Sequence, residues 1–238
     1  MKALEVHLQH QLNCSNFFWH RLRAHAVSIF FPGDRPFRVL DIGAGAGLLG
    51  EFIVNHYPQA TYHFIEPIES LEEELSVRFG SDRNAKSAVD FREFDRVVLL
   101  DVLEHQRDDR EFASELVWKM KPDGVLVLTV PAMQMLWSQW DVALGHFRRY
   151  GKSELRRAFA GLPVQWLEVS YLFPEMVPLG LVRKLRRPSH AAPGRDETDL
   201  PALPRTVNGA LYVIARLSFA ARAGAPLGTS ILGALRRT

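Results

Sequence analysis

The chain has 238 residues, of which 47% are hydrophobic and 24% charged, and its net charge is +2. These values argue against a disordered chain, because a sizeable core can be buried, and against a nucleic-acid partner recruited by overall charge. The single cysteine, Cys14, excludes an internal disulfide or a cysteine-based zinc site and favours the cytoplasm, and we find neither a signal peptide nor a transmembrane run.

The first predicted element is a helical arm over residues 4–31, within a segment 1–34 that precedes the core. Its apolar residues recur at helical spacing: Leu4, Leu8, Leu12, Trp19, Leu22, Val27 and Phe30. Pro32-Gly33-Asp34 then ends the helix.

Residues 35–131 alternate between short apolar runs and helical patterns. We predict strands at 38–42, 61–65, 96–100 and 125–130, and helices at 47–57, 68–79 and 109–120. A further strand should lie within 80–94, where no clean pattern shows. Strands that are apolar throughout and alternate with helices predict a parallel sheet covered on both faces.

Residues 132–238 have a different pattern. We predict an insertion over 132–151, a helix over 152–160, a strand over 164–171, a mobile loop over 183–205, a helix over 206–222 and a last strand over 229–235. Together with the core, these elements predict one domain, 1–238, with an α/β, doubly wound, seven-stranded sheet and a helical C-terminal insertion.

A glycine turn, Asp41–Gly47, follows the first strand. Glycines between a strand and a helix expose backbone N–H groups to a ligand at close range. Glu66 ends the next strand, from where a carboxylate can accept hydrogen bonds from a ribose diol. Residues 45–50 also match the G-x-G-x-x-G dinucleotide fingerprint, but Gly43 and Asp41 lie ahead of it, and this register favours S-adenosylmethionine (SAM) over NAD.

Three segments together resemble the class I SAM-dependent methyltransferases. Val39–Gly47 (VLDIGAGAG) resembles their first motif, Phe94–His105 (FDRVVLLDVLEH) the fourth-strand motif, and Lys121–Pro131 (KPDGVLVLTVP) the turn and strand that follow. The resemblance implies a Rossmann-like fold with residues 35–131 as the SAM-binding core. Gly228–Leu235 is similar to the last strand of that fold, which is antiparallel.

The same resemblance implies the residues that bind the cofactor. They are Asp41, Gly43, Ala44, Gly45, Gly47, Glu66, Pro67, Asp101 and Val102. The glycine turn would hold the methionyl end, Glu66 the ribose hydroxyls, and Asp101 with its neighbour the floor of the site. The unclear segment 80–94 leaves the residue beside adenine unnamed.

Two histidines are candidates for catalysis. His105 follows the fourth strand and His146 lies in the insertion, where either could accept a proton from a protonated nucleophile. Each also has a structural interpretation, as a helix cap or a loop anchor. Asp101, Glu104 and His105 resemble an arrangement in ubiquinone-pathway O-methyltransferases, but a cofactor floor beside a helix cap explains them better, and we assign no metal ligand.

The insertion resembles a subgroup of these enzymes with a Trp, Asp, Gly-His and Arg-Arg-Tyr pattern, and Asn16–Arg21 resembles its aromatic arm. The substrate-side candidates are Trp19, Trp137, Asp141, Arg148, Arg149 and Tyr150. The two arginines suit a carboxylate or phosphate of the substrate, or else they pair with Asp141 or Glu154 and hold the loop.

The C-terminal part is unusually apolar at Leu172–Val182 and is followed at once by the basic run RKLRRP. Val207, Ala210, Leu211, Ile214 and Leu217 share one helix face. Such faces fit a membrane surface, a core or a dimer contact. We therefore predict methyl transfer to an oxygen, or less readily a nitrogen, of a small or lipid-linked acceptor, with peripheral membrane contact, a homodimer and a partner subunit left open. The alternatives are an NAD-dependent oxidoreductase and a non-catalytic SAM-binding subunit. We expect no nucleic-acid partner, because the Asn/Asp-Pro-Pro-Tyr/Phe signature is absent.

Overall fold

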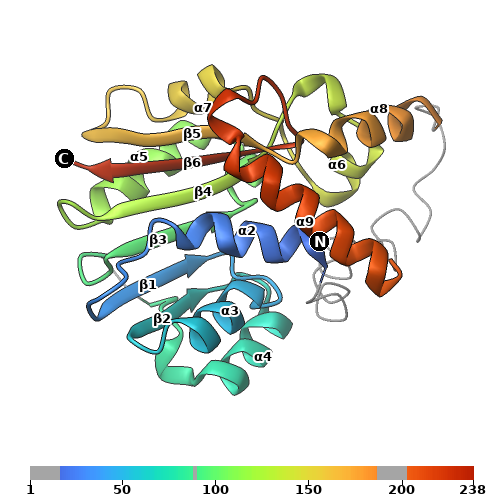
Figure 1. Ribbon diagram of the computed structural model, residues 1–238. Coiled ribbons are helices and arrows are strands. Elements are labelled where there is room, and N and C mark those ends of the chain that lie inside the picture. The colour runs from blue at the N-terminus through green and yellow to red at the C-terminus, as the bar shows by residue number, and fades with distance from the viewer. Residues whose placement is uncertain (1–16, 88–89, 187–202) are drawn as a thin grey trace.

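The computed structural model describes residues 17–87, 90–186 and 203–238, and their centre is a six-stranded sheet (Figure 1). The strands are β1 (Phe37–Ile42), β2 (Ala60–Ile65), β3 (Arg96–Leu100), β4 (Val125–Pro131), β5 (Val164–Leu172) and β6 (Ser230–Arg237), in the order β2-β1-β3-β4-β6-β5. The first four pair in parallel, whereas β6 lies antiparallel between β4 and β5. The expected mostly parallel sheet with an antiparallel last strand is confirmed.

Helices cover both faces of the sheet (Figure 1). They are α2 (Phe18–Ser28), α3 (Leu48–His56), α4 (Glu69–Phe79), α5 (Asp109–Lys119), α6 (Gln139–Leu144), α7 (Lys152–Ala158), α8 (Val177–Arg186) and α9 (Arg205–Ala220). Alternate strand residues point to opposite faces, so Val39 and Val98 pack with α2, α3 and α9, while Leu40 and Val97 pack with α5 and α7. None of the helices described is both long and apolar enough to cross a membrane.

The sheet has six strands rather than the predicted seven. Within 80–94 the described residues form a 3-10 turn, η1 (Ser81–Arg83), and two isolated parallel bridges, from Asn84 to Phe64 of β2 and from Phe91 to Met120. At the β2 edge, Ala85 N donates to Phe64 O at 2.8 Å, and Asn84 donates its side-chain amide to Glu72 instead of packing an apolar residue. The polar side chain leaves a strand little to bury beside β2, so only one bridge forms there.

Two other boundaries differ from those predicted. The helical arm is described only from residue 17, and α2 ends at Ser28; residues 4–16, with Cys14, lie outside the described residues. The predicted loop over 183–205 is too long, because α8 continues to Arg186 and α9 begins at Arg205, while 187–202 lie outside the description. The basic run RKLRRP therefore begins inside a helix.

Candidate functional site

A cavity of about 810 Å³ lies at the carboxyl ends of β1, β2 and β3. Ligands of parallel sheets bind at this edge, and the volume suits a small molecule of cofactor size together with a second ligand. The glycine turn, α2, α3, α6 and α8 all contribute residues to its lining. The cavity therefore gathers residues from the N-terminal arm, the core and the C-terminal part.

The glycine turn adopts a conformation that other residues resist. Gly43, Gly45 and Gly47 all have positive φ, at 72°, 55° and 72°. A Cβ on Gly43 would lie 2.7 Å from Cγ2 of Val102, so this glycine also allows close packing. Gly43 and Gly45 line the cavity, as does Ala44, whereas Gly47 sits at the start of α3 and is not among the lining residues described.

Two buried carboxylates flank the turn. Glu66 accepts backbone hydrogen bonds from Gly45 N at 2.7 Å and Ile68 N at 2.9 Å, and burial raises its pKa despite them. Asp41 accepts the Tyr62 hydroxyl on Oδ2 at 3.0 Å, while its buried Oδ1 has no partner. Burial raises the pKa of Asp41 to about 7. A buried oxygen without a donor at a cavity wall fits a ligand that supplies a donor or a positive charge.

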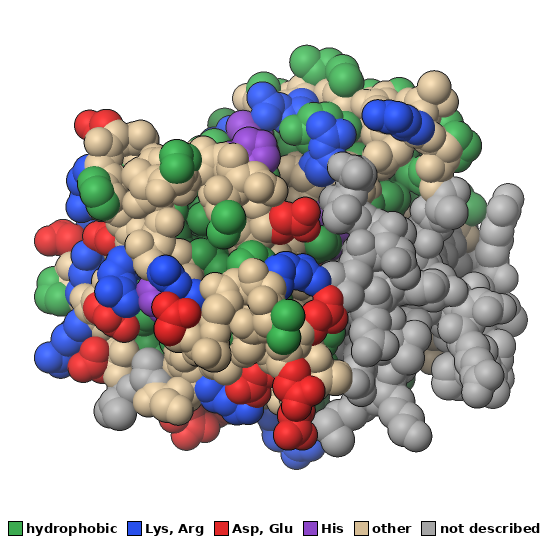
Figure 2. Space-filling view, turned by 90° about the horizontal axis from the view of Figure 1, so that it is seen from below, with side chains coloured by type: hydrophobic (Ala, Val, Ile, Leu, Met, Phe, Trp, Pro, Cys, Tyr) green, Lys and Arg blue, Asp and Glu red, His purple; other side chains and the backbone are tan. Residues whose placement is uncertain are grey.

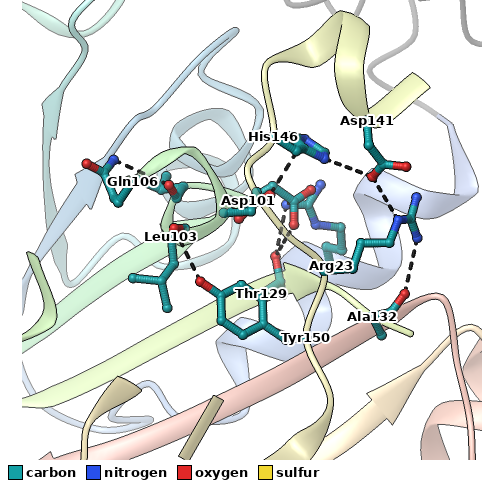
Figure 3. A network of polar contacts seen from close by, with 12 residues as sticks. Arg23, Asp101, Leu103, Gln106, Thr129, Ala132, Asp141, His146 and Tyr150 are labelled. Carbon is teal, nitrogen blue, oxygen red and sulfur yellow. Dashed lines mark hydrogen bonds and ion pairs between the residues drawn. The ribbon is translucent and has the colours of Figure 1, made fainter. Parts of the chain in front are cut away.

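Arg23 of α2 is a site residue that the sequence analysis missed. Its Nη2 lies 3.0 Å from Oδ2 of Asp101 and donates to Oγ1 of Thr129 at 3.0 Å, while the Thr129 hydroxyl donates to Oδ1 of Asp101 (Figure 3). Arg23 is buried and its Nε has no partner. Trp19 precedes it by one helical turn, so both side chains face the cavity, and that spacing was the only signal in the sequence.

Trp19 stacks on Phe173, with ring centroids 3.8 Å apart and planes 4° from parallel. This stack joins the N-terminal arm to the segment before α8, and Trp19 lines the cavity as expected for a substrate-side residue. Pro67, Asp101 and Val102 also line it, at the carboxyl ends of β2 and β3.

The two predicted histidines meet at the cavity wall. The rings of His105 and His146 are 4.8 Å apart at 81°. Nδ1 of His146 lies 3.0 Å from Oδ1 of Asp141, and its Nε2 lies 4.0 Å from Oε1 of Glu104 (Figure 3). Burial and the neighbouring His146 lower the pKa of His105 to about 4, so His105 is neutral near neutral pH.

Glu104 lies behind these histidines, fully buried, with no hydrogen-bond partner on either carboxylate oxygen. Burial and the charge of Asp101 raise its pKa well above the usual value. Glu104, His105 and His146 each offer a ligand atom, all within 4.8 Å of one another, and could hold a divalent ion. Asp101, considered with Glu104 and His105 from the sequence, is instead paired with Arg23.

Asp141 organises the insertion. It is buried and accepts Ser138 N at 2.9 Å and Arg149 Nε at 2.7 Å in addition to His146. Burial alone would raise the pKa of Asp141, but these partners lower it. Arg149 also donates to Ala132 O at 3.1 Å and lines the cavity, so Asp141 holds two cavity residues in place without itself being among the lining residues described.

The structure does not bring Trp137, Arg148 and Tyr150 to the lining described for this cavity. Arg148 pairs with Asp109 of α5 at 2.8 Å, and the buried Tyr150 hydroxyl donates to the same carboxylate at 2.8 Å. Successive side chains of an extended segment point to opposite sides, so Arg149 faces the cavity while both neighbours face α5. The contacts of Arg148 and Tyr150 with Asp109 anchor the loop, so the structure places these two side chains away from the described cavity lining.

Known proteins resemble this chain in part of its sequence and in its fold. Residues 9–162 match the family model described as "Methyltransferase domain". A ubiquinone biosynthesis O-methyltransferase of Rhodopseudomonas palustris (strain TIE-1) is 32% identical over 116 residues, which cover 45% of this chain and 44% of that protein. The match therefore spans less than half the length of the curated relative.

Two of the solved structures that share the fold match 92% of this chain. The methyltransferase in a complex with the Trm112 methyltransferase activator of Haloferax volcanii has a TM-score of 0.59 at 15% identity, covering 92% of this chain and 89% of that one. A geranyl diphosphate C-methyltransferase of Streptomyces coelicolor A3(2), solved with Mg²⁺, geranyl diphosphate and S-adenosyl-L-homocysteine, has a TM-score of 0.58 at 13% identity, covering 92% and 79%.

Proposed function

The chain belongs to the methyltransferase domain family and is a class I enzyme that uses SAM, and from this premise we propose that it methylates an oxygen atom, less readily a nitrogen, of a small or lipid-linked acceptor. The observation that carries the proposal is the Asp141–His146 pair at the cavity wall. The curated relative is named an O-methyltransferase, which agrees with an oxygen acceptor.

The match to a methyltransferase domain argues against the NAD-dependent alternative. The third glycine of the literal fingerprint, Gly50, lies inside α3, where a Cβ would come within 2.5 Å of the Tyr62 ring. Gly50 therefore lets α3 approach β2, a packing role that does not depend on which cofactor binds.

The residues around the glycine turn fit SAM. The unpartnered Oδ1 of Asp41 suits its ammonium group, and the second lone pairs of the Glu66 oxygens suit the ribose hydroxyls. Nε of Arg23, buried and unpartnered, is the matching donor for a carboxylate. Bound there, SAM supplies an activated methyl group on a sulfonium, which leaves the protein to align the acceptor and exclude water.

His146 is the proposed general base. Because Asp141 binds Nδ1, the remaining nitrogen, Nε2, is the one that can take a proton from the acceptor hydroxyl; Oε1 of Glu104, 4.0 Å from Nε2, is beyond hydrogen-bond distance. As that O–H bond breaks, the oxygen bonds to the methyl carbon and the carbon–sulfur bond breaks, without a net oxidation. Asp141 stabilises the resulting imidazolium, and neutral His105 adds no second positive charge beside it.

Two acceptors that differ in their need for a base test this role. A catechol must lose a proton, whereas thiophenol is already ionised in mildly alkaline buffer. His146→Gln should slow methyl transfer from radiolabelled SAM to catechol about 100-fold, as expected for loss of a general base. Transfer to thiophenol should change little, and binding of S-adenosylhomocysteine, measured by calorimetry, should be retained.

The matched control is His25→Gln, because His25 packs against Phe219 outside the described cavity lining. This variant should methylate both acceptors at the wild-type rate. Equal losses on catechol and thiophenol in His146→Gln would mean that His146 only shapes the site, and the proposed proton transfer would be withdrawn.

A further inference from the structure

Helix α9 exposes an apolar stripe although its opposite face is already packed. Ala215 and Phe219 are buried in the core, while Val207, Val213, Ile214 and Leu217 are exposed, Leu217 to 68%. A helix that is apolar around most of its circumference is normally covered on all sides. The stripe is therefore a surface that lacks a cover among the described residues.

The described residues of α8 and α9 carry no negative charge. Residues 176–186 and 203–238 contain no aspartate or glutamate, while Arg205 and Arg216 are exposed on α9 and Lys184 is exposed on α8. By contrast, the face of the molecule shown in Figure 2 mixes acidic and basic side chains. An apolar stripe flanked only by basic residues fits a layer of apolar chains below anionic groups.

The same two helices border the cavity. Leu179 and Gly180 of α8 line it, as do Met176 just before α8 and Tyr212 of α9. Leu179 is also 58% exposed, so its side chain belongs both to the cavity wall and to the outer surface. The exposed surface thus reaches the mouth of the cavity at Leu179 of α8, whereas α9 meets the cavity through Tyr212, on the packed side of that helix.

We propose that α8 and the exposed face of α9 dock on an anionic lipid bilayer, which brings a membrane-held acceptor to the cavity mouth. This inference rests on the proposed function for the acceptor but not for the docking. A second copy of the chain fits less well, since a two-fold contact through this face would set the basic residues of both copies together, and the described parts of α8 and α9 offer no acid to pair them. Lipid head groups supply the missing negative charge.

Cosedimentation of the full chain with vesicles tests the docking. Vesicles of phosphatidylcholine alone should retain little protein, and vesicles mixed with phosphatidylglycerol should retain most of it. Leu217→Glu should weaken the binding about tenfold or more, because one large apolar side chain leaves the bilayer. Val77→Glu is the matched control, since Val77 is 89% exposed on α4 and the same change there should not alter binding.

Each remaining outcome has a clear meaning. Failure to bind either vesicle, or equal losses in Leu217→Glu and Val77→Glu, overturns the docking surface. A dimer in sedimentation equilibrium that Leu217→Glu dissociates also overturns it and makes the stripe a contact between copies. Binding of S-adenosylhomocysteine is measured on every variant; its absence in the wild type would refute the proposed function and leave the vesicle result standing, because docking needs no cofactor.

Discussion

Replacing Asp41 by asparagine tests the electrostatics of the cofactor site. Asp41 is buried at the end of β1, and its carboxylate accepts one hydrogen bond, from Tyr62. Burial raises its pKa from 3.8 to about 7. Asparagine keeps the shape and an acceptor for the Tyr62 hydroxyl but cannot ionise, so its stability does not titrate; its NH2 group takes the place of the unpartnered Oδ1, a cost that is the same at every pH.

The magnitude follows from the pKa difference. The pKa of Asp41 is roughly three pH units higher in the folded chain, and at about 1.36 kcal/mol per unit the ionised carboxylate costs about 4 kcal/mol of folding free energy. Between the unfolded pKa and the folded pKa, the unfolded chain has released a proton that the folded chain keeps, so wild-type stability falls as pH rises through this window. The free energy of unfolding of Asp41→Asn, taken relative to that of the wild type, should therefore rise by about 2–3 kcal/mol from about pH 5 to about pH 8.

Urea unfolding followed by tryptophan fluorescence, without cofactor, measures this difference at the two pH values. Binding of S-adenosylhomocysteine should move the opposite way, weakening about tenfold in Asp41→Asn because the ammonium loses its counter-charge. A stability difference that is the same at both pH values would refute the raised pKa of Asp41. Unchanged cofactor affinity would refute its proposed contact with the ammonium.

Three further changes test other parts of the site. Gly43→Ala should weaken S-adenosylhomocysteine binding at least about tenfold in calorimetry, because the new methyl group meets Val102 at a backbone φ of 72°; unchanged affinity would show that the turn adapts. Arg23→Met should lower the free energy of unfolding by about 2–4 kcal/mol, since it leaves Asp101 without its buried partner; adding Asp101→Asn should restore part of this loss, and strict additivity would contradict the pairing. The lowered pKa of His105 means that the unfolded chain binds a proton that the folded chain refuses, so stability should fall as pH drops from 6.5 to about 4; His105→Leu should flatten that slope in thermal unfolding, and an unchanged slope would place the titration elsewhere.

The sequence was sufficient for the part of the site that one strand–turn–helix unit builds. Asp41, Gly43, Gly45 and Glu66 line the cavity because of local chain geometry, since a strand that ends in glycines presents its backbone at the same edge as the end of the next strand. The parallel sheet was also predictable from the sequence, because apolar strands that alternate with helices have few other ways to bury both faces of a sheet.

Tertiary structure alone decided which distant residues meet. Nothing near Arg23 in the sequence marks Asp101 as its partner, and the pair forms because α2 packs across the sheet beside β4. Likewise, side chains alternate along the loop, and the sequence does not say which of them point inward. Arg149 faces the cavity and Tyr150 faces α5 because Asp141 and Asp109 bind them there. The local sequence pattern determines the helices and strands and where they end. Such long-range pairings depend instead on how whole helices and loops pack on the sheet, and no short stretch of sequence carries that information.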